Sequence, residues 1–209
     1  MIDARLLAFA GVAALLTITP GADTLLVVRN SMARGRAGGL LTTLGICSGL
    51  FVHAILSALG VSAVIVHSAT AFETLKILGA AVLFVLGVQS LRGALSPTRP
   101  VEATTVASAA PVSRGYVEGL LTNVLNPKVA IFYLAVLPQF VTAEDPVLAR
   151  SLLLAGIHAG QGLVWLSLVA ALVGRTRGLM RSRGAQRALQ ALSGVALIGF
   201  GARLALAKR

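Results

Sequence analysis

Charged side chains interrupt the long apolar runs of this sequence at two places where a helix is also expected to break. Asp23 follows Pro20-Gly21, and Lys128 follows Asn126-Pro127. A carboxylate or an ammonium group at the centre of a membrane helix costs about 2.5 to 3.5 kcal/mol on insertion scales, so such groups are expected to face protein or water and to serve a function. The pair could bind a zwitterion or carry a proton.

Both breaks would leave unpaired backbone groups in the middle of an apolar run. Pro20 and Pro127 lack the N–H donor that a helix requires, and Gly21 loosens the backbone beside the first of them. The half-helix after a break presents free N–H groups and the half before it presents free carbonyls. We expect the amides after Pro20 or Pro127 to bind the carboxylate of an amino acid. The alternative is that both prolines only kink helices for packing.

Four polar side chains would complete this site, by binding the substrate's ammonium group or by fixing the broken backbone: Asp23, Asn30, Asn123 and Asn126. Asp23 is also a proton-carrier candidate, because an intramembrane carboxylate is functional by default. Lys128 is its expected partner from the other half of the chain. The alternative for Lys128 is that its ammonium group extends to the membrane surface.

Two histidines and a cysteine lie inside apolar runs. His53 and His158 are candidates for proton coupling, although a neutral histidine that bonds across helices is the commoner arrangement in membranes. Cys47 is the single cysteine of the chain, so no intramolecular disulfide and no CxxC redox pair can form. We interpret it as an inert buried thiol.

The composition is that of a membrane protein. Hydrophobic residues make up 56% of the 209 residues, charged residues 12%, and the mean hydropathy is +0.88. Apolar runs of roughly 20 residues, long enough to cross a bilayer, recur along the chain. Because they are continuous rather than alternating, the sequence predicts an all-α integral membrane protein with six transmembrane helices. Their approximate ranges are 5–28, 39–66, 72–91, 115–141, 147–173 and 188–207.

The formal net charge of +11 comes from bases that flank the apolar runs, which argues against nucleic-acid binding. Arginines concentrate in the loops between segments 1 and 2, 3 and 4, and 5 and 6. The positive-inside rule makes these loops cytoplasmic and places both termini outside, in a multi-pass protein of a bacterial-type inner membrane. Arg203, Lys208 and Arg209 weigh against that orientation.

The two halves of the chain show a weak internal sequence repeat. Pro20 corresponds to Pro127, and residues 45–49 (GICSG) correspond to residues 156–160 (GIHAG), where we expect close helix contacts or sliding surfaces. Residues 1–94 and 115–209 would each form a three-helix repeat, joined by a flexible linker at 95–114. An odd number of spans inverts the second repeat, which is a transporter architecture with its binding site near the midplane.

Two segments carry a family resemblance: TPGADTLLVVRNSMARGRAGGL with the following LGICSGLFVHAILSALG, and GLLTNVLNPKVAIFYLAVLPQFV. They resemble the LysE/RhtB family of amino-acid exporters over nearly the whole chain. One departure is Pro20-Gly21-Ala22, where the family commonly has Pro-Gly-Pro. The resemblance implies export of amino acids or close relatives, driven by the proton gradient.

Other functions are less well supported. A cation or metal exporter of related fold would have only Asp23, His53 and His158 as a thin ligand set. An intramembrane electron carrier needs a second cysteine, and an enzyme is not expected because neither HExxH nor GxSxG occurs. We expect no cofactor and no bound metal. The expected partners are an amino acid and the lipid bilayer, and the oligomeric state stays open.

Overall fold

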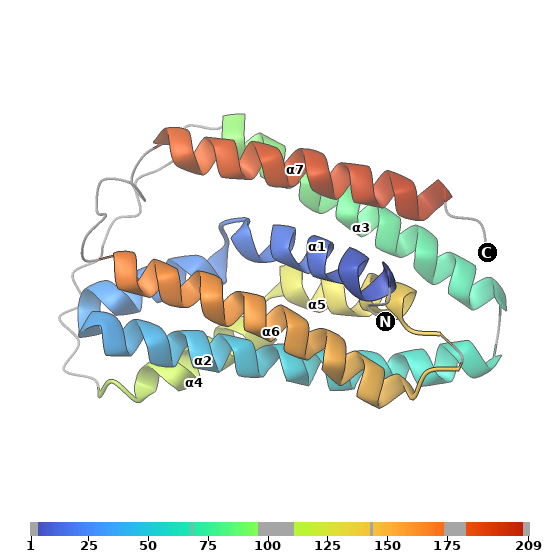
Figure 1. Ribbon diagram of the computed structural model, residues 1–209, viewed down its shortest axis with the longest axis horizontal. Coiled ribbons are helices and arrows are strands. Elements are labelled where there is room, and N and C mark those ends of the chain that lie inside the picture. The colour runs from blue at the N-terminus through green and yellow to red at the C-terminus, as the bar shows by residue number, and fades with distance from the viewer. Residues whose placement is uncertain (1–3, 68, 96–110, 143, 174–182, 207–209) are drawn as a thin grey trace.

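The computed structural model describes residues 4–67, 69–95, 111–142, 144–173 and 183–206, and the regular structure in these ranges is helical (Figure 1). The bilayer offers the backbone no hydrogen-bond partner, so apolar runs satisfy their own N–H and C=O groups as helices. The elements are α1 (Ala4–Ile18), α2 (Ala22–His67), α3 (Ala69–Leu95), α4 (Arg114–Val124), α5 (Pro127–Ala135), the 3-10 helix η1 (Leu137–Phe140), α6 (Val147–Leu172) and α7 (Arg183–Leu206).

The all-α prediction is confirmed, but six long separate spans are not seen in the described residues. Residues 22–60 of α2 and the whole of α6 are each long and apolar enough to cross a membrane. The α4–α5–η1 segment makes a third span if its bend of 52° is included. α1 and parts of α3 and α7 are apolar but shorter. Residues 96–110, most of the predicted linker, lie outside the described part of the chain.

The turn expected between the first two segments lies inside α2, at Gly35. The sequence predicted an arginine-rich loop between residues 28 and 39; the turn is shorter, because helix extends through Arg34 and only Gly35 is non-helical, with φ 71° and ψ −175°. Positive φ at this position favours glycine. Arg29 and Arg34, which precede this turn, both bind Glu118 of α4.

Both predicted helix breaks are confirmed. α1 ends at Ile18 and α2 begins at Ala22, so Pro20 and Gly21 lie between them. α4 ends at Val124 and α5 begins with Pro127 at its first position, where the missing N–H costs nothing. Each half of the chain therefore contains an interrupted helix.

The helices pack side by side in pairs that are far apart in the sequence (Figure 1). α3 packs along α7, α2 packs against α4 and α6, and α1 lies against α6. Buried aromatic rings fill the centre, with Phe9 of α1 6.0 Å from Phe132 of α5 between ring centroids. The prediction of glycine contacts is confirmed for Gly45 and Gly49 of α2.

A Cβ atom on Gly45 would collide with the α4 backbone, and one on Gly49 would lie 2.6 Å from Asn123 Oδ1. The close contact expected for α6 is not seen, because Gly156 and Gly160 are exposed and have open space around them. The backbones of α2 and α4 therefore approach each other closely at Gly45 and Gly49, whereas Gly156 and Gly160 of α6 are on the outer surface.

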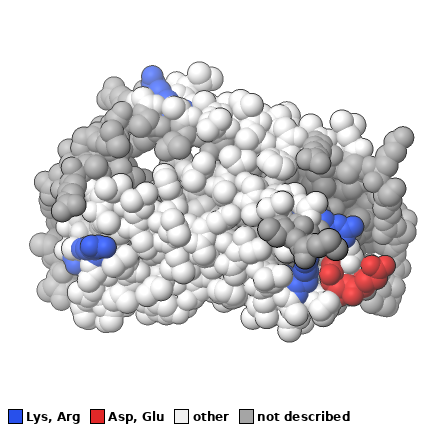
Figure 2. All heavy atoms as spheres, in the orientation of Figure 1, with Lys and Arg blue, Asp and Glu red and all other residues white. Residues whose placement is uncertain are grey.

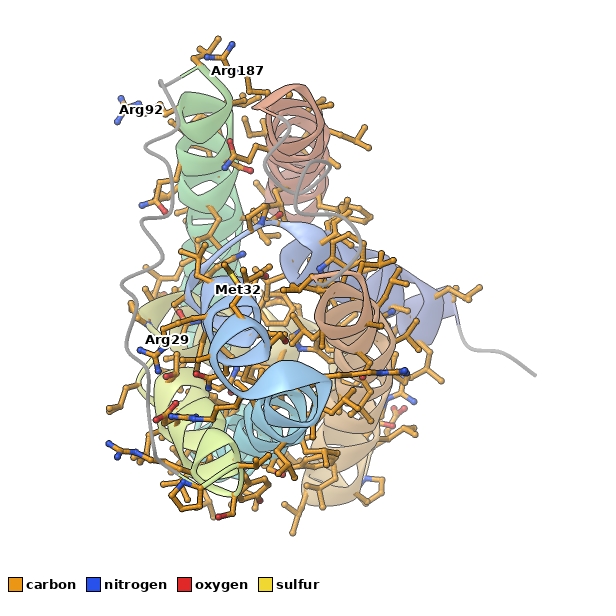
Figure 3. The ribbon with its side chains drawn as sticks, turned by 90° about the vertical axis from the view of Figure 1, so that its left-hand side faces the viewer. Arg29, Met32, Arg92 and Arg187 are labelled. Carbon is orange, nitrogen blue, oxygen red and sulfur yellow. The ribbon has the colours of Figure 1, made fainter. Side chains whose placement is uncertain are left out.

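Charged side chains gather toward the ends of the long axis. On the face shown in Figure 2, Lys, Arg, Asp and Glu lie near the edges and the broad middle is uncharged. Figure 3 views the end that carries Arg29, Arg92 and Arg187, which belong to α2, α3 and α7. Basic residues from three helices separated in the sequence thus share one end of the bundle.

Candidate binding site between the broken helices

A cavity of about 50 Å³ lies where the two helix breaks meet. Its polar lining comes from both halves of the chain: Thr17, Thr19, Gly21, Asp23, Thr24, Asn123, Asn126 and Lys128. The rest of the lining is mainly apolar and comes from α1, α2, α5 and α6. A volume of this size holds a few water molecules. The cavity is therefore small and lies around a polar centre.

Asp23 lies in the first turn of α2 and is held by two asparagines of the other half. Asn123 Nδ2 donates to Asp23 Oδ2 at 2.8 Å, and Asn126 Nδ2 donates to Oδ1 at 3.3 Å. The positive end of the α2 dipole also favours a negative group there. These contacts fix the carboxylate in one orientation at the edge of the cavity.

Lys128 reaches from α5 to the other broken helix. Its Nζ donates to the carbonyls of Leu16 at 3.0 Å and Thr19 at 3.1 Å, where α1 has just ended. A cation at a helix C-terminus neutralises carbonyls that lack intrahelical donors. The predicted contact of Lys128 with the first half of the chain exists, but its hydrogen bonds go to these carbonyls. The surface-directed alternative for Lys128 does not describe this conformation.

The N-terminus of α5 is already capped, which changes the expected role of its amides. The Asn126 side chain accepts from the Lys128 N–H at 3.0 Å, and the Asn126 carbonyl accepts from Val129 and Ala130. Pro127 has no N–H to offer. In this conformation the amides after Pro127 have partners, so the free first-turn amides of α2, after Pro20, are the remaining backbone donors near the cavity.

Both histidine candidates lie next to this centre and are hydrogen-bonded. His53 Nε2 lies 3.0 Å from the carbonyl oxygen of Asn123, so this nitrogen donates. His158 lines the cavity, and its Nδ1 lies 3.2 Å from the hydroxyl of Tyr133, whose carbonyl in turn accepts from Ser57. The histidines thus connect the cavity to the packed interior of α2, α5 and α6.

The structure brings together nine of the ten residues singled out from the sequence as binding or proton-coupling candidates. Pro20 and Pro127 shape the breaks, and the others line the cavity or touch a residue that does: Gly21, Asp23, His53, Asn123, Asn126, Lys128 and His158. Asn30 does not join them. It donates to Thr42 at 2.8 Å and to Glu118 at 2.9 Å, in a separate polar cluster.

That second cluster is centred on Glu118, which the sequence interpretation missed. Glu118 accepts from Arg29, Asn30 and Arg34, and it pairs with Arg114 one turn earlier in α4 at 3.2 Å. The sequence did contain a signal for Glu118: it is an acidic residue inside an apolar run, the same feature that identified Asp23. No such signal marked Tyr133 or Thr19, whose roles depend on packing.

The arrangement places opposite charges on one cavity, with fixed amides and carbonyls around them. A carboxylate can bind an ammonium group, and Lys128 can bind a carboxylate, so the chemistry fits a zwitterion. Among the described residues there is no group of three or more His, Cys, Asp or Glu side chains placed to hold a metal ion.

Comparison with known proteins places the chain in a family. A family model described as LysE type translocator matches residues 14–208. An uncharacterized membrane protein of Bacillus subtilis is 32% identical over 206 residues, which cover 96% of this chain and 98% of the relative. The homoserine/homoserine lactone efflux protein of Salmonella typhimurium is 29% identical, with 93% of this chain and 92% of the relative covered.

The threonine efflux protein of Escherichia coli is 31% identical over 91% of this chain and 92% of its own length. No solved structure matches. The family model covers far more than half of the sequence, and the relatives are matched along almost their whole length. The chain therefore belongs to the LysE type translocator family.

Proposed function

We propose that this protein is a secondary active exporter of amino acids or close derivatives across the cytoplasmic membrane, coupled to protons. The observation that carries the proposal is the joint placement of Asp23 and Lys128 on one cavity between two interrupted helices. The names of the relatives in Salmonella and Escherichia coli, which are efflux proteins for homoserine and threonine, support the substrate class.

The substrate's two backbone charges have matching partners. Its ammonium group binds the Asp23 carboxylate, which Asn123 and Asn126 hold in place. Its carboxylate binds Lys128, because an ammonium group has three N–H donors and Lys128 uses two of them on Leu16 and Thr19. The first-turn amides of α2 add further donors.

Proton coupling follows from competition for one carboxylate. A proton and the substrate's ammonium group cannot both occupy Asp23, so release of one permits binding of the other, which is the requirement for antiport. The titratable groups near Asp23 are Lys128 of α5, His158 of α6, and His53 and Cys47 of α2. His53 and His158 are the candidates for relaying the proton between Asp23 and the ends of the protein.

The repeats and orientation form part of the same proposal. Residues 1–94 and 115–209 act as inverted three-helix repeats, which the meeting of the two breaks and the pairing of α3 with α7 support. The end that carries Arg29, Arg92 and Arg187 faces the cytoplasm under the positive-inside rule, with both termini on the outside (Figure 3).

Proteoliposomes test the function directly. Vesicles loaded with a radiolabelled amino-acid mixture are diluted into acidic buffer, so that protons flow inward as amino acids leave. We expect efflux to exceed that from protein-free vesicles and to fall when a protonophore collapses the gradient. If no amino acid leaves faster than it does from protein-free vesicles, while a divalent cation does, the alternative of a cation exporter replaces the proposal.

A further inference from the structure

We propose that the apolar end of the cavity is the subsite for the substrate's side chain, that it selects amino acids with short, uncharged side chains, and that Cys47 and Gly162 set its size. The proposal rests on the exporter function proposed above. It adds what that function leaves open, namely which amino acids are carried and which residues discriminate between them.

The subsite is the part of the lining where α2 meets α6. Ile46, Cys47 and Leu50 face it from α2, and Gly162 and Leu166 face it from α6. The Cys47 Sγ donates to the carbonyl of Ala159 at 3.5 Å, which ties the two helices together beside the cavity. A substrate bound through Asp23 and Lys128 would direct its side chain toward this wall, because the polar lining lies at the broken helices.

At Gly162 the α6 side of the subsite lies close to Cys47 of α2. A Cβ atom built there would lie 3.2 Å from Cys47 Sγ, tighter than an ordinary van der Waals contact. Gly156 and Gly160, on the same helix, have nothing within 4 Å of such an atom. Gly162 therefore leaves room on the cavity side of α6, and with a cavity of about 50 Å³ that room decides how large a side chain fits.

The charges in the lining argue against charged side chains. Asp23 and Lys128 are its acidic and basic residues, apart from His158, and the substrate's own ammonium and carboxylate groups occupy both. His158 is bonded to Tyr133 through Nδ1, which leaves the other ring nitrogen for a neutral partner such as a hydroxyl. A lysine or glutamate side chain would be desolvated against apolar walls without a counter-charge.

A transport panel with the wild-type protein tests the selectivity. Proteoliposomes are assayed with glycine, alanine, threonine, homoserine and valine as short neutral substrates, and with lysine, glutamate and tryptophan as charged or bulky ones. We expect kcat/KM for the best short neutral substrate to exceed those for lysine, glutamate and tryptophan at least tenfold. Equal rates for lysine or glutamate overturn this inference and leave the exporter function standing, whereas absence of all amino-acid transport overturns the function itself.

Two variants with opposite effects test the residues. Gly162→Ala adds a methyl group to the subsite, so kcat/KM for valine should fall about tenfold relative to that for glycine. Cys47→Ala enlarges the subsite and should raise kcat/KM for valine, and likewise for leucine, relative to that for glycine. Gly156→Ala is the matched control, expected to leave the ratio unchanged.

The readout is a ratio between two substrates of the same protein, so a lower yield of folded protein does not alter it. If Gly162→Ala does not fold, Cys47→Ala alone decides the matter. An unchanged valine-to-glycine ratio in the folded variants, or an equal shift in Gly156→Ala, overturns the assignment of these residues.

Discussion

Arg34 of α2 and Glu118 of α4 face each other in a two-pronged ion pair, with Nη1 3.1 Å from Oε2 and Nη2 3.0 Å from Oε1. The Arg34 side chain is only 6% exposed and that of Glu118 is 19% exposed. The pair joins residues next to the Gly35 turn to the first turns of the fourth apolar segment. It therefore joins the part of α2 that precedes Gly35 to α4.

Removal of Glu118 should destabilise the protein strongly. Glu118→Ala leaves the buried Arg34 without its counter-charge, and breaking one side of a buried ion pair costs about 3 to 5 kcal/mol. We expect the lower part of this range, because Glu118 retains some exposure to solvent. Urea unfolding of the purified protein in detergent measures the loss.

Arg114→Gln is the matched control for this experiment. Arg114 also pairs with Glu118, but its side chain is 64% exposed, so we expect a loss below about 1 kcal/mol. Equal losses for Glu118→Ala and Arg114→Gln would contradict the idea that the Arg34 contact is the stabilising one.

Asp23→Asn should remove proton coupling while the protein stays folded. In the wild type, protons compete with the substrate's ammonium group, so acidification on the side from which substrate binds should raise KM. Asparagine cannot bind a proton, so the residual flux of the variant should not depend on pH, and kcat/KM should drop at least tenfold. Efflux measured between pH 6 and pH 8 checks both points; a variant that keeps the wild-type pH dependence would exclude Asp23 as the proton carrier.

Asp145→Asn is the control for the loss of an aspartate. Asp145 lies in the loop before α6, where hydrogen bonds from the Thr142 backbone N–H and hydroxyl lower its pKa. A lowered pKa means that its stabilising contribution is present above the unfolded value of about 3.9 and is lost as pH falls through the lower folded value. Between pH 6 and pH 8 it does not titrate, so this variant should keep the wild-type pH dependence of transport.

The sequence predicted the broken helices well, because proline and glycine act locally on the backbone. Pro20 and Pro127 interrupt their helices where expected, and the unfavourable placement of Asp23 and Lys128 in apolar runs identified two charges that share the cavity. Such effects depend on residue type and position along one helix. No knowledge of the neighbouring helices was needed.

The errors came from contacts between helices. Asn30 follows Asp23 by seven residues, about 10 Å along a helix, and continued helix carries it to Glu118 instead of the cavity. The amides after Pro127 were expected to bind a carboxylate, but Asn126, in its expected role of fixing the broken backbone, already caps them. Gly156 and Gly162 are both glycines of α6, and only the packing of that helix shows that Gly162 faces the cavity and Gly156 does not.

Lys128→Gln should abolish recognition of the substrate's carboxylate. The wild type should prefer an amino acid to its methyl ester, because the ester lacks the negative charge that pairs with Lys128. The variant should transport both poorly and with similar kcat/KM. It should also lose up to about 2 kcal/mol of stability, because the carbonyls of Leu16 and Thr19 lose a cation at the end of α1.

Competition assays with the amino acid and its methyl ester measure the preference, and thermal unfolding measures the stability. Lys128→Arg is the matched variant, because it keeps the positive charge and should keep part of the preference for the free carboxylate. A Lys128→Gln protein that still rejects the ester would show that the amides of α2, and not Lys128, bind the carboxylate.

One introduced cysteine at either end of the bundle should report the orientation. Ser113 precedes α4 at the end that carries Arg29, and Glu144 lies in the loop between η1 and α6; both are exposed. Because the basic end is proposed to face the cytoplasm, a membrane-impermeant maleimide should label Glu144→Cys in intact cells and Ser113→Cys only after permeabilisation. The wild type, whose Cys47 is buried, provides the unlabelled control. The reverse pattern would invert the proposed topology and place the arginine-rich loops outside, against the positive-inside rule.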